Sequence, residues 1–329
     1  MKSTWGSSKG GGDPNIVVTG ASGRIGHLLV KRLIDEGNSI RAMVHEKGNI
    51  RDLPPGTVPF VGDITEPGSC GDALEGAEVV YHLAGLREAA NASTADMMRA
   101  NVEGTKNIAA ACVRNKVKQL VFASTTDVYC NKREGLISED TEPFATDKYG
   151  YTKMLAEQEI VRSGAPYTIL RLGTIYGPGF ERSFFKIFKA LREGKAVIIG
   201  RGDNHLPMVH IDDVVDAMVV VMEKRGAAIN KTYNVCDGED HTQEYLIKLA
   251  AGMLGVEAPK RHAQELMVRL LAKTRGLDSD ELRFLTAERY IDVSKIGREL
   301  GWKPRVRIEK AGKDMVEDFM RKSGKDGSA

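Results

Sequence analysis

A tyrosine and a lysine stand four residues apart in the stretch Tyr149-Gly150-Tyr151-Thr152-Lys153. Residues at i and i+4 share one face of an α-helix, so a helix here would make Tyr149 and Lys153 neighbours. A phenol with a pKa near ~10 is a poor acid or base at neutral pH, but a nearby ammonium favours its ionised form. Lowering that pKa by ~3 units takes about 4 kcal/mol of differential stabilisation. The pair is therefore either a proton donor and acceptor for a carbonyl or an alcohol, or an ordinary solvated helix face.

Three hydroxyl residues, Ser124, Thr125 and Thr126, follow the apolar run Gln119 to Ala123 just upstream. Such a run predicts a buried strand, and open α/β folds place their reacting groups at the carboxyl ends of strands. A hydroxyl at that position would hydrogen-bond a substrate oxygen beside the tyrosine. The alternative is a Ser/Thr turn that merely closes the strand.

Glycines recur with the spacing G-x-x-G-x-x-G at Gly20, Gly23 and Gly26. The apolar run Asn15 to Val18 precedes them, and apolar residues at helical spacing follow from Ile25 to Leu33. A strand, a glycine turn and a helix together predict a dinucleotide-binding loop, because glycine lets the backbone approach a pyrophosphate at the helix N-terminus. The loop residues expected to bind the cofactor are Gly20, Ser22, Gly23, Arg24, Ile25 and Gly26.

Short apolar runs alternate with helical patterns along the first half of the chain. Further strands are expected at residues 39–44, 58–61, 77–84, 119–124 and 167–171, with helices at 97–115 and 149–162. This alternation predicts an α/β fold with a doubly wound parallel (Rossmann) sheet over residues 15–172. Residues 173–329 are expected to form mainly a smaller substrate-binding lobe, with segments such as 207–224 returning to the first domain. Residues 1–14 are interpreted as a disordered leader.

These motifs, in this order, resemble the extended short-chain dehydrogenases/reductases, also called the NAD-dependent epimerase/dehydratase family. The resemblance runs from Asn15 to about Phe319. Besides the pieces above it rests on Gly62-Asp63-Ile64-Thr65, Tyr81-His82-Leu83-Ala84-Gly85, Asn101-Val102-Glu103-Gly104-Thr105, the segment from Leu170 to Gly179, Val209-His210-Ile211-Asp212-Asp213 and Glu299-Leu300-Gly301-Trp302.

The resemblance implies a role for each matching residue. Tyr149 would donate or accept the proton, Lys153 would lower its pKa and bind the nicotinamide ribose, and Thr125, with Ser124 as second choice, would be the catalytic hydroxyl. Asn101 would support the active-site helix. The remaining cofactor contacts would be Asp63 and Ile64 at the adenine, Leu83, Ala84 and Gly85 along the pyrophosphate and ribose, and Leu172 and Thr174 near the nicotinamide. His82 is interpreted as a strand histidine whose ring nitrogens are satisfied.

The end of the second predicted strand indicates which nicotinamide cofactor is used. A carboxylate there would accept hydrogen bonds from the ribose hydroxyls and favour NAD, but the position holds Val44. His45 follows it, and arginines such as Arg24 and Arg41 are near in sequence, which suits a 2′-phosphate. NADP(H) is therefore favoured and NAD(H) stays possible, since a register slip would make Glu46 a ribose acceptor.

The sequence before Val209 bears on the reaction. Sugar-nucleotide members of the resembled family carry an arginine that clamps the diphosphate, and this chain has Leu206 there. Met267, Leu270, Leu271, Leu282, Phe284 and Leu285 are candidates for an apolar pocket or for helix packing. Together with the run Leu282 to Thr286, they favour the hydroxysteroid-dehydrogenase and dihydroflavonol-reductase branches. The predicted reaction interconverts a ketone and a secondary alcohol on a hydrophobic or mid-sized substrate. A sugar-nucleotide epimerase or dehydratase, and a non-catalytic NADP-binding regulator, are the alternatives.

The composition gives no sign of a nucleic-acid or membrane partner, so we expect the partner to be a small-molecule substrate. The 47 basic and 45 acidic side chains leave a net charge of +2, which gives no case for nucleic acid, and the longest apolar run, residues 217–222, is too short for a bilayer. The four cysteines form no CxxC pair, so no metal site is expected. We expect a cytoplasmic protein, and the resemblance suggests a homodimer through the helices at 97–115 and 149–162.

Overall fold

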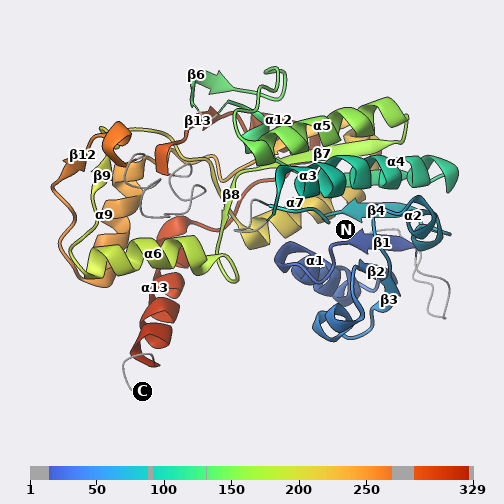
Figure 1. Ribbon diagram of the computed structural model, residues 1–329, viewed down its shortest axis with the longest axis horizontal. Coiled ribbons are helices and arrows are strands. Elements are labelled where there is room, and N and C mark those ends of the chain that lie inside the picture. Colours follow the sequence, from blue (N-terminus) through green and yellow to red (C-terminus); the bar gives the residue numbers. More distant parts are fainter. Residues whose placement is uncertain (1–14, 88–91, 131, 269–284, 326–329) are drawn as a thin grey trace.

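The computed structural model describes residues 15–87, 92–130, 132–268 and 285–325 (Figure 1). It confirms the predicted α/β fold, because a seven-stranded parallel sheet with the order β11-β7-β5-β4-β1-β2-β3 forms its centre. The strands are β1 (Ile16–Thr19), β2 (Ile40–Val44), β3 (Val58–Val61), β4 (Val79–His82), β5 (Gln119–Thr125), β7 (Tyr167–Leu172) and β11 (Lys231–Val235). The predicted leader, residues 1–14, lies outside the described residues.

The strand order reverses at the middle of the sheet. β1 pairs with β2 on one side, with Val18 opposite Ala42, and with β4 on the other, with Val18 opposite Tyr81. From β1 the chain winds outward first towards β3 and then towards β11. In such a sheet the crevice between the two outgoing connections, at the carboxyl ends of the strands, is where ligands bind.

Helices cover both faces of the sheet, as Figure 1 shows. One face packs against α1 (Arg24–Asp35), α7 (Ile211–Glu223) and α12 (Ser294–Leu300). The other packs against α2 (Pro67–Ala73), α4 (Gly104–Arg114) and α5 (Lys148–Ser163). The inner strands read as nearly continuous apolar runs because both of their faces are buried, whereas the edge strand β3 is largely exposed and the edge strand β11 carries polar residues. α7 belongs to the segment 207–224, and it adds Val214, Val215 and Met218 to the core beside α1.

A second apolar core lies beside the sheet. It is built from α6 (Glu181–Arg192), α9 (Gln243–Leu254) and α13 (Ile308–Lys325), with Phe188, Ile247 and Phe319 among its buried residues. Two short parallel strand pairs lead into it, β8 (Thr174–Tyr176) with β10 (Met208–His210) and β9 (Ile198–Ile199) with β12 (His262–Ala263). We call the part of the chain around this core the second lobe; its first buried residue, Tyr176, stands in the glycine- and proline-rich segment that follows β7.

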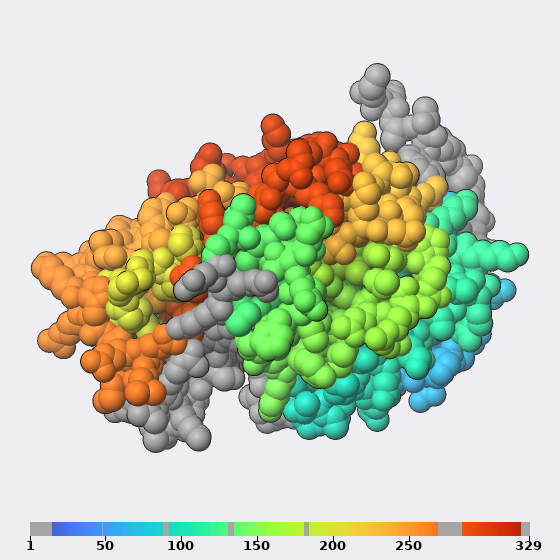
Figure 2. Space-filling view, turned by 90° about the horizontal axis from the view of Figure 1, so that it is seen from above, coloured from blue at the N-terminus to red at the C-terminus, as the bar shows by residue number. Residues whose placement is uncertain are grey.

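The C-terminal segment ties the two units together. β13 (Glu288–Ile291) pairs in parallel with β6 (Lys132–Ile137), which is inserted between β5 and α5. Figure 2 shows the green segment that includes β6 against the orange-red C-terminal segment. Trp302, just after α12, is buried in the sheet-side core, which places it in packing.

None of the helices in the described part of the chain has both the length and the apolar character needed to cross a membrane.

Candidate functional site

The glycine loop is closed so tightly that side chains would not fit. Gly20 has a φ of +68°, and a Cβ there would stand 2.7 Å from the Ala84 nitrogen. A Cβ on Gly26 would stand 2.2 Å from the Gly20 carbonyl oxygen, while the Gly23 N–H donates to that oxygen at 3.0 Å. Gly23 directly precedes α1 and has no side chain to occupy the first-turn N–H groups. The shape of this cradle is compatible with the pyrophosphate of a dinucleotide, which the predicted residues Gly20, Ser22, Gly23, Arg24, Ile25 and Gly26 would hold.

Helix α5 places the tyrosine and the lysine on one face, one turn apart. Asp147 caps the helix by accepting a hydrogen bond from the Gly150 N–H at 2.8 Å. Tyr149 is half-buried, with the Arg87 guanidinium 5.2 Å from its ring centroid. Lys153 is only 5% exposed, and its Nζ lies 3.8 Å from the centroid of the Phe122 ring. Burial lowers the pKa of Lys153 to about 7, against the opposing effect of the Glu157 charge one turn further on.

The two candidate hydroxyls at the end of β5 have different surroundings. Ser124 donates to Glu157 Oε1 at 2.5 Å, and Glu157 is held by Arg171 through Nη2 at 2.7 Å. All three side chains are buried, so the Ser124 hydroxyl is committed to this structural network. Thr125 accepts a hydrogen bond from the Asp127 N–H at 3.1 Å and keeps its own proton to donate. The geometry therefore favours Thr125 over Ser124 as the hydroxyl that meets a substrate.

The turn after β5 brings Thr125 against the start of α5. A Cβ on Gly150 would stand 2.2 Å from the Asp127 carbonyl oxygen, so only glycine permits this approach. The Asp127 carboxylate also accepts a hydrogen bond at 2.7 Å from Nη1 of Arg289, a residue of β13 that is 4% exposed. Sequence reasoning missed Arg289, which fixes the turn between Thr125 and Tyr149.

Asn101 connects the strand β4 region to α5. It lies in a π-helical turn, η2 (Met98–Glu103), between α3 (Thr94–Met97) and α4. Its side-chain amide pairs with the backbone of Leu86 in both directions, at 2.7 and 2.8 Å, and donates to the Thr152 hydroxyl at 2.9 Å. The segment Leu83 to Gly85 precedes that contact, and Gly85 packs directly on the Asn101 side chain. These contacts agree with a supporting role for Asn101, since they join it to the helix that carries Tyr149.

The far end of the crevice is formed by the residues after β2 and β3. Asp63 and Ile64 follow β3, and His45 Nε2 lies 3.3 Å from the Asp63 carboxylate. Burial alone would raise the pKa of Asp63, but hydrogen bonds from Thr65 and the contact with His45 lower it overall. Val44 closes β2 as a buried residue, so the last side chain of this strand is apolar.

Arg24 and Arg41, which were considered for the 2′-phosphate of NADP, both contact other groups of the protein. The Arg24 guanidinium lies 5.4 Å from the Phe180 ring centroid, and Arg41 donates to the carbonyls of Ala73 and Glu75. Arg41 is thus occupied by the backbone at the C-terminal end of α2, whereas His45 lies just after β2, beside Asp63.

Leu172 and Thr174 lie where β7 passes into β8. Leu172 is buried, Thr174 is half-buried, and the Thr174 N–H donates to the Pro207 carbonyl at 2.7 Å. This bond places Leu206 and Pro207 next to the strand that the sequence assigned to the nicotinamide. Leu206 itself is 2% exposed and packs in the core of the second lobe.

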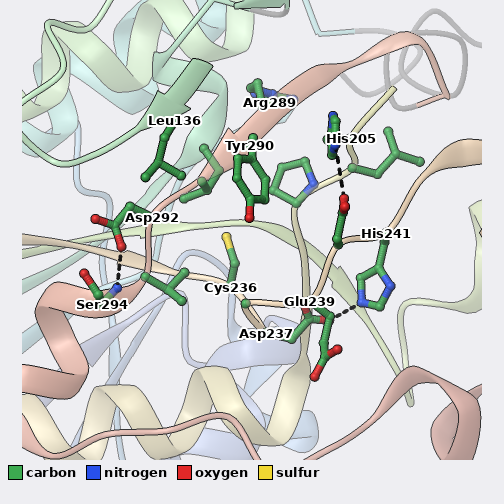
Figure 3. Close-up of a pocket in the computed structure, with 16 residues that line it drawn as sticks. Leu136, His205, Cys236, Asp237, Glu239, His241, Arg289, Tyr290, Asp292 and Ser294 are labelled. Carbon is green, nitrogen blue, oxygen red and sulfur yellow. Dashed lines mark hydrogen bonds and ion pairs between the residues drawn. The ribbon is translucent and has the colours of Figure 1, made fainter. Parts of the chain in front are cut away.

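A cavity of about 260 Å³ lies beside this segment and is drawn in Figure 3. Its polar lining includes the hydrogen-bonded pair Asp237 and His241, at 2.8 Å, and His205, whose Nδ1 lies 2.6 Å from Glu288. Arg289 and Tyr290 line another side. Of the apolar pocket candidates, Leu270, Leu271, Leu282 and Phe284 lie outside the described residues, Met267 is exposed and Leu285 is half-buried.

The sequence and structure were compared with those of known proteins. The sequence model of the NAD dependent epimerase/dehydratase family matches residues 16–236. A 3beta-hydroxysteroid-dehydrogenase/decarboxylase from Arabidopsis thaliana is 28% identical over 92% of this chain and 79% of its own. The UDP-glucose 4-epimerase of Vibrio cholerae is 27% identical over 93% of this chain and 96% of its own. The structure of MoeE5 in complex with UDP-glucose and NAD is 25% identical, with a TM-score of 0.75 over 94% of this chain and 99% of that one.

The match spans the cradle, the hydroxyl-bearing strand end and the Tyr149–Lys153 helix, and these relatives are similar to the chain over most of its length. The resemblance drawn from the motifs is thereby confirmed. The chain belongs to the NAD-dependent epimerase/dehydratase family of enzymes, among the extended short-chain dehydrogenases/reductases.

Proposed function

We propose that the protein is an NAD(P)-dependent oxidoreductase that interconverts a ketone and a secondary alcohol on a hydrophobic or mid-sized substrate. The observation that carries this choice is Leu206, buried at the point where sugar-nucleotide members are expected to present an arginine. An apolar side chain offers no hydrogen bond to a diphosphate, whereas a guanidinium would make two. The segment next to Thr174 therefore lacks a guanidinium clamp at this position, which favours a substrate without a diphosphate.

Each residue around the reacting carbonyl would have one role in the reaction. A bound nicotinamide supplies the hydride, or accepts it in the reverse direction. Tyr149 gives its proton to the developing alkoxide, and Thr125 donates a hydrogen bond to the same oxygen. Lys153, one turn along the helix, favours the ionised phenol and binds the nicotinamide ribose. Asn101 and the Asp127 turn hold the two ends of this set in place.

For the cofactor we propose NADP(H). Val44 leaves the end of β2 without a carboxylate, and His45 stands at the ribose end with most of its side chain exposed. NAD(H) is the alternative, supported by NAD in the MoeE5 structure and by the Asp63 carboxylate beside His45. Fluorescence titration of NADPH and NADH, with the His45→Asp variant in parallel, separates them. NADPH should bind more tightly to the wild type, and the variant should reverse that order, whereas equal or tighter binding of NADH to the wild type would overturn the proposal.

A sugar-nucleotide epimerase or dehydratase is the second candidate, because MoeE5 holds UDP-glucose and covers nearly the whole chain. Arg289 is a buried guanidinium beside the cavity of Figure 3 and would be its diphosphate clamp. Its pairing with Asp127 at 2.7 Å already uses that charge, which is why we rank this function second. The intact set of Thr125, Tyr149 and Lys153 leaves a non-catalytic NADP-binding regulator as the least favoured reading.

The experiment is a parallel turnover assay. NADPH or NADH is supplied with apolar ketones, such as a steroid ketone and a long-chain 3-oxo ester, and NAD is supplied with UDP-glucose. With the ketones, we expect the absorbance of the reduced nicotinamide to fall as turnover proceeds. In Tyr149→Phe the absorbance should stay constant. Tyr151→Phe is the matched control, because this exposed tyrosine lies two residues along the same helix. Epimerised sugar nucleotide without any ketone turnover would refute the proposed substrate class.

We also propose a homodimer in the cytoplasm. Exposed apolar side chains lie on both helices expected at the interface, Val113 on α4 and Tyr151 and Val161 on α5. Light scattering after size exclusion measures the mass directly. Replacing Val161 by Glu should shift a dimer towards the monomer, and a wild-type protein of monomer mass would refute the assembly.

A further inference from the structure

A continuous row of buried hydrogen bonds crosses the interior from the glycine loop to the catalytic helix. Its side chains are Thr19 at the end of β1, His82 at the end of β4, Thr105 in α4, Asn101 in η2 and Thr152 in α5, and each is at most 1% exposed. We propose that this row, called here the interior relay, positions Tyr149 relative to the cofactor cradle, with His82 as its fixed neutral link. The proposal rests on the proposed function only in taking Tyr149 as the acid and base.

At the end of the relay nearest the glycine loop, Thr19 Oγ1 has two hydrogen-bond partners. The Ala84 N–H, which touches Gly20 across the loop, donates to Thr19 Oγ1 at 3.2 Å. A backbone amide can only donate, so Thr19 Oγ1 accepts there and keeps its own proton, which can point to His82 Nδ1, 2.8 Å away. His82 Nδ1 accepts this bond when the neutral ring carries its proton on Nε2.

The other side of His82 fixes the second nitrogen. Thr105 Oγ1 lies 2.6 Å from the Asn101 carbonyl oxygen, which can only accept, so the single hydroxyl proton of Thr105 points there. His82 Nε2 lies 2.9 Å from the same hydroxyl oxygen and must supply a proton to it. The two ends together require neutral His82 with its proton on Nε2.

The surroundings of His82 support the neutral form. Its ring stacks on Phe122 with centroids 5.5 Å apart, and the Lys153 ammonium lies over the same Phe122 ring. Burial first, and then the Lys153 charge, lower the pKa of His82 to about 3. A second positive charge at this place would also leave the Thr19 proton without its acceptor.

Asn101 and Thr152 carry the relay into α5. The Asn101 amide is oriented by its paired bonds with Leu86, which leaves one N–H for the Thr152 hydroxyl. Thr152 then donates to the Tyr149 carbonyl oxygen at 2.8 Å. Every donor from Ala84 to Thr152 thus has one acceptor, and replacing a side chain of the row removes the hydrogen bond on each side of it. Movement of the loop at Gly20 is in this way coupled to the backbone of the catalytic tyrosine.

The first test reads the proton on His82 directly. In histidine-labelled protein, two-dimensional nitrogen NMR distinguishes the two ring nitrogens, with the His82 signal assigned by its absence in His82→Phe or, if that variant does not fold, by its shift in Thr105→Ser. We expect a neutral ring protonated on Nε2 that does not titrate between about pH 5 and 8. Protonation on Nδ1, or titration of His82 in this window, overturns the relay.

The second test measures the ionisation of the Tyr149 phenol. Thr105→Val keeps the shape and removes the hydroxyl, and Thr105→Ser restores it; Thr152→Val and Thr152→Ser repeat the pair at the helix end. The titration midpoint of the Tyr149 ring carbon, assigned with Tyr149→Phe, is measured with and without the nicotinamide cofactor. The valine variants should shift it by at least about half a pH unit, and the serine variants should match the wild type. Unchanged midpoints in both valine variants would overturn the coupling. If the His82 protonation and the midpoint shifts are as expected but the protein turns over no ketone, the result counts against the proposed function alone.

Discussion

Replacing Lys153 by methionine is expected to raise the free energy of unfolding at neutral pH and to lose most of that gain at alkaline pH. The side chain is 5% exposed, and burial lowers its pKa from 10.5 to about 7. Between these two values the folded protein binds fewer protons than the unfolded chain, so the wild type gains stability as the pH rises through this range. Methionine has a similar length without the charge and removes this dependence.

The size of the effect follows from the same two pKa values. Each unit of difference is worth about 1.4 kcal/mol. Linkage then costs the wild type about 4 kcal/mol at pH ~7 and about 1.4 kcal/mol at pH ~9.5. The stability difference between Lys153→Met and the wild type should therefore shrink by about 3 kcal/mol between these conditions.

Urea unfolding at the two pH values measures this difference. Lys148→Met is the matched control, because it makes the same substitution at an exposed lysine in the first turn of the same helix. The same difference for Lys153→Met at both pH values would refute the argument that burial of the ammonium sets the stability here. The variant should also lose turnover, so a gain in stability would accompany the loss of a catalytic group.

Three further outcomes are expected. Gly20→Ala should weaken nicotinamide-cofactor binding at least about tenfold in a fluorescence titration, because the new Cβ would clash with the backbone of Ala84. Gly37 also has a positive φ but has no atoms near its missing Cβ, so Gly37→Ala is the control and should leave binding unchanged. Tyr149→Phe should reduce turnover of a ketone substrate at least about a hundredfold with little change in cofactor affinity by calorimetry, and equal losses in both would indicate a structural defect instead. Arg289→Met should cost about 3 kcal/mol or more in urea unfolding, because it removes the buried guanidinium that pairs with the Asp127 carboxylate; a loss below about 1 kcal/mol would show that the pair contributes little.

The parts of the site that were predicted from the sequence are those whose spacing is local. The glycine loop lies between a strand and a helix that are contiguous with it, and Tyr149 and Lys153 are separated by one helical turn. Local spacing carries directly into local geometry. For the same reason the strands of the central sheet before residue 173 were found to within a few residues, whereas β6 (Lys132–Ile137), outside that sheet, was not predicted.

The supports of the site depend on distant pairs and were not predicted. Arg289 meets Asp127 from 162 residues away, and Glu157 meets Ser124 from 33 residues away. No pattern in a single sequence relates residues so far apart. The interior relay was missed for the same reason, although His82 was interpreted correctly as a strand histidine with both ring nitrogens satisfied.

Strand β11 was missed because its sequence, Lys231-Thr-Tyr-Asn-Val, mixes polar and apolar residues. Its polar side chains have structural partners, since Asn234 accepts from the Tyr129 hydroxyl at 2.9 Å and donates to the Asp292 carbonyl at 3.2 Å. Buried polar residues that are satisfied by remote partners look like loop residues in a sequence.

The late position of β11 has a consequence for synthesis on the ribosome. β7 is complete at Leu172, but the strand that covers its outer edge is supplied by residues 231–235, so about sixty residues must emerge before the sheet is finished. During that interval the nascent chain presents the hydrogen-bonding edge of an apolar strand, which invites pairing with other chains. A gene fragment that stops near residue 172 would keep this edge permanently open. The central sheet is thus completed only after residues 173–230, which include α6 and α7, have been made.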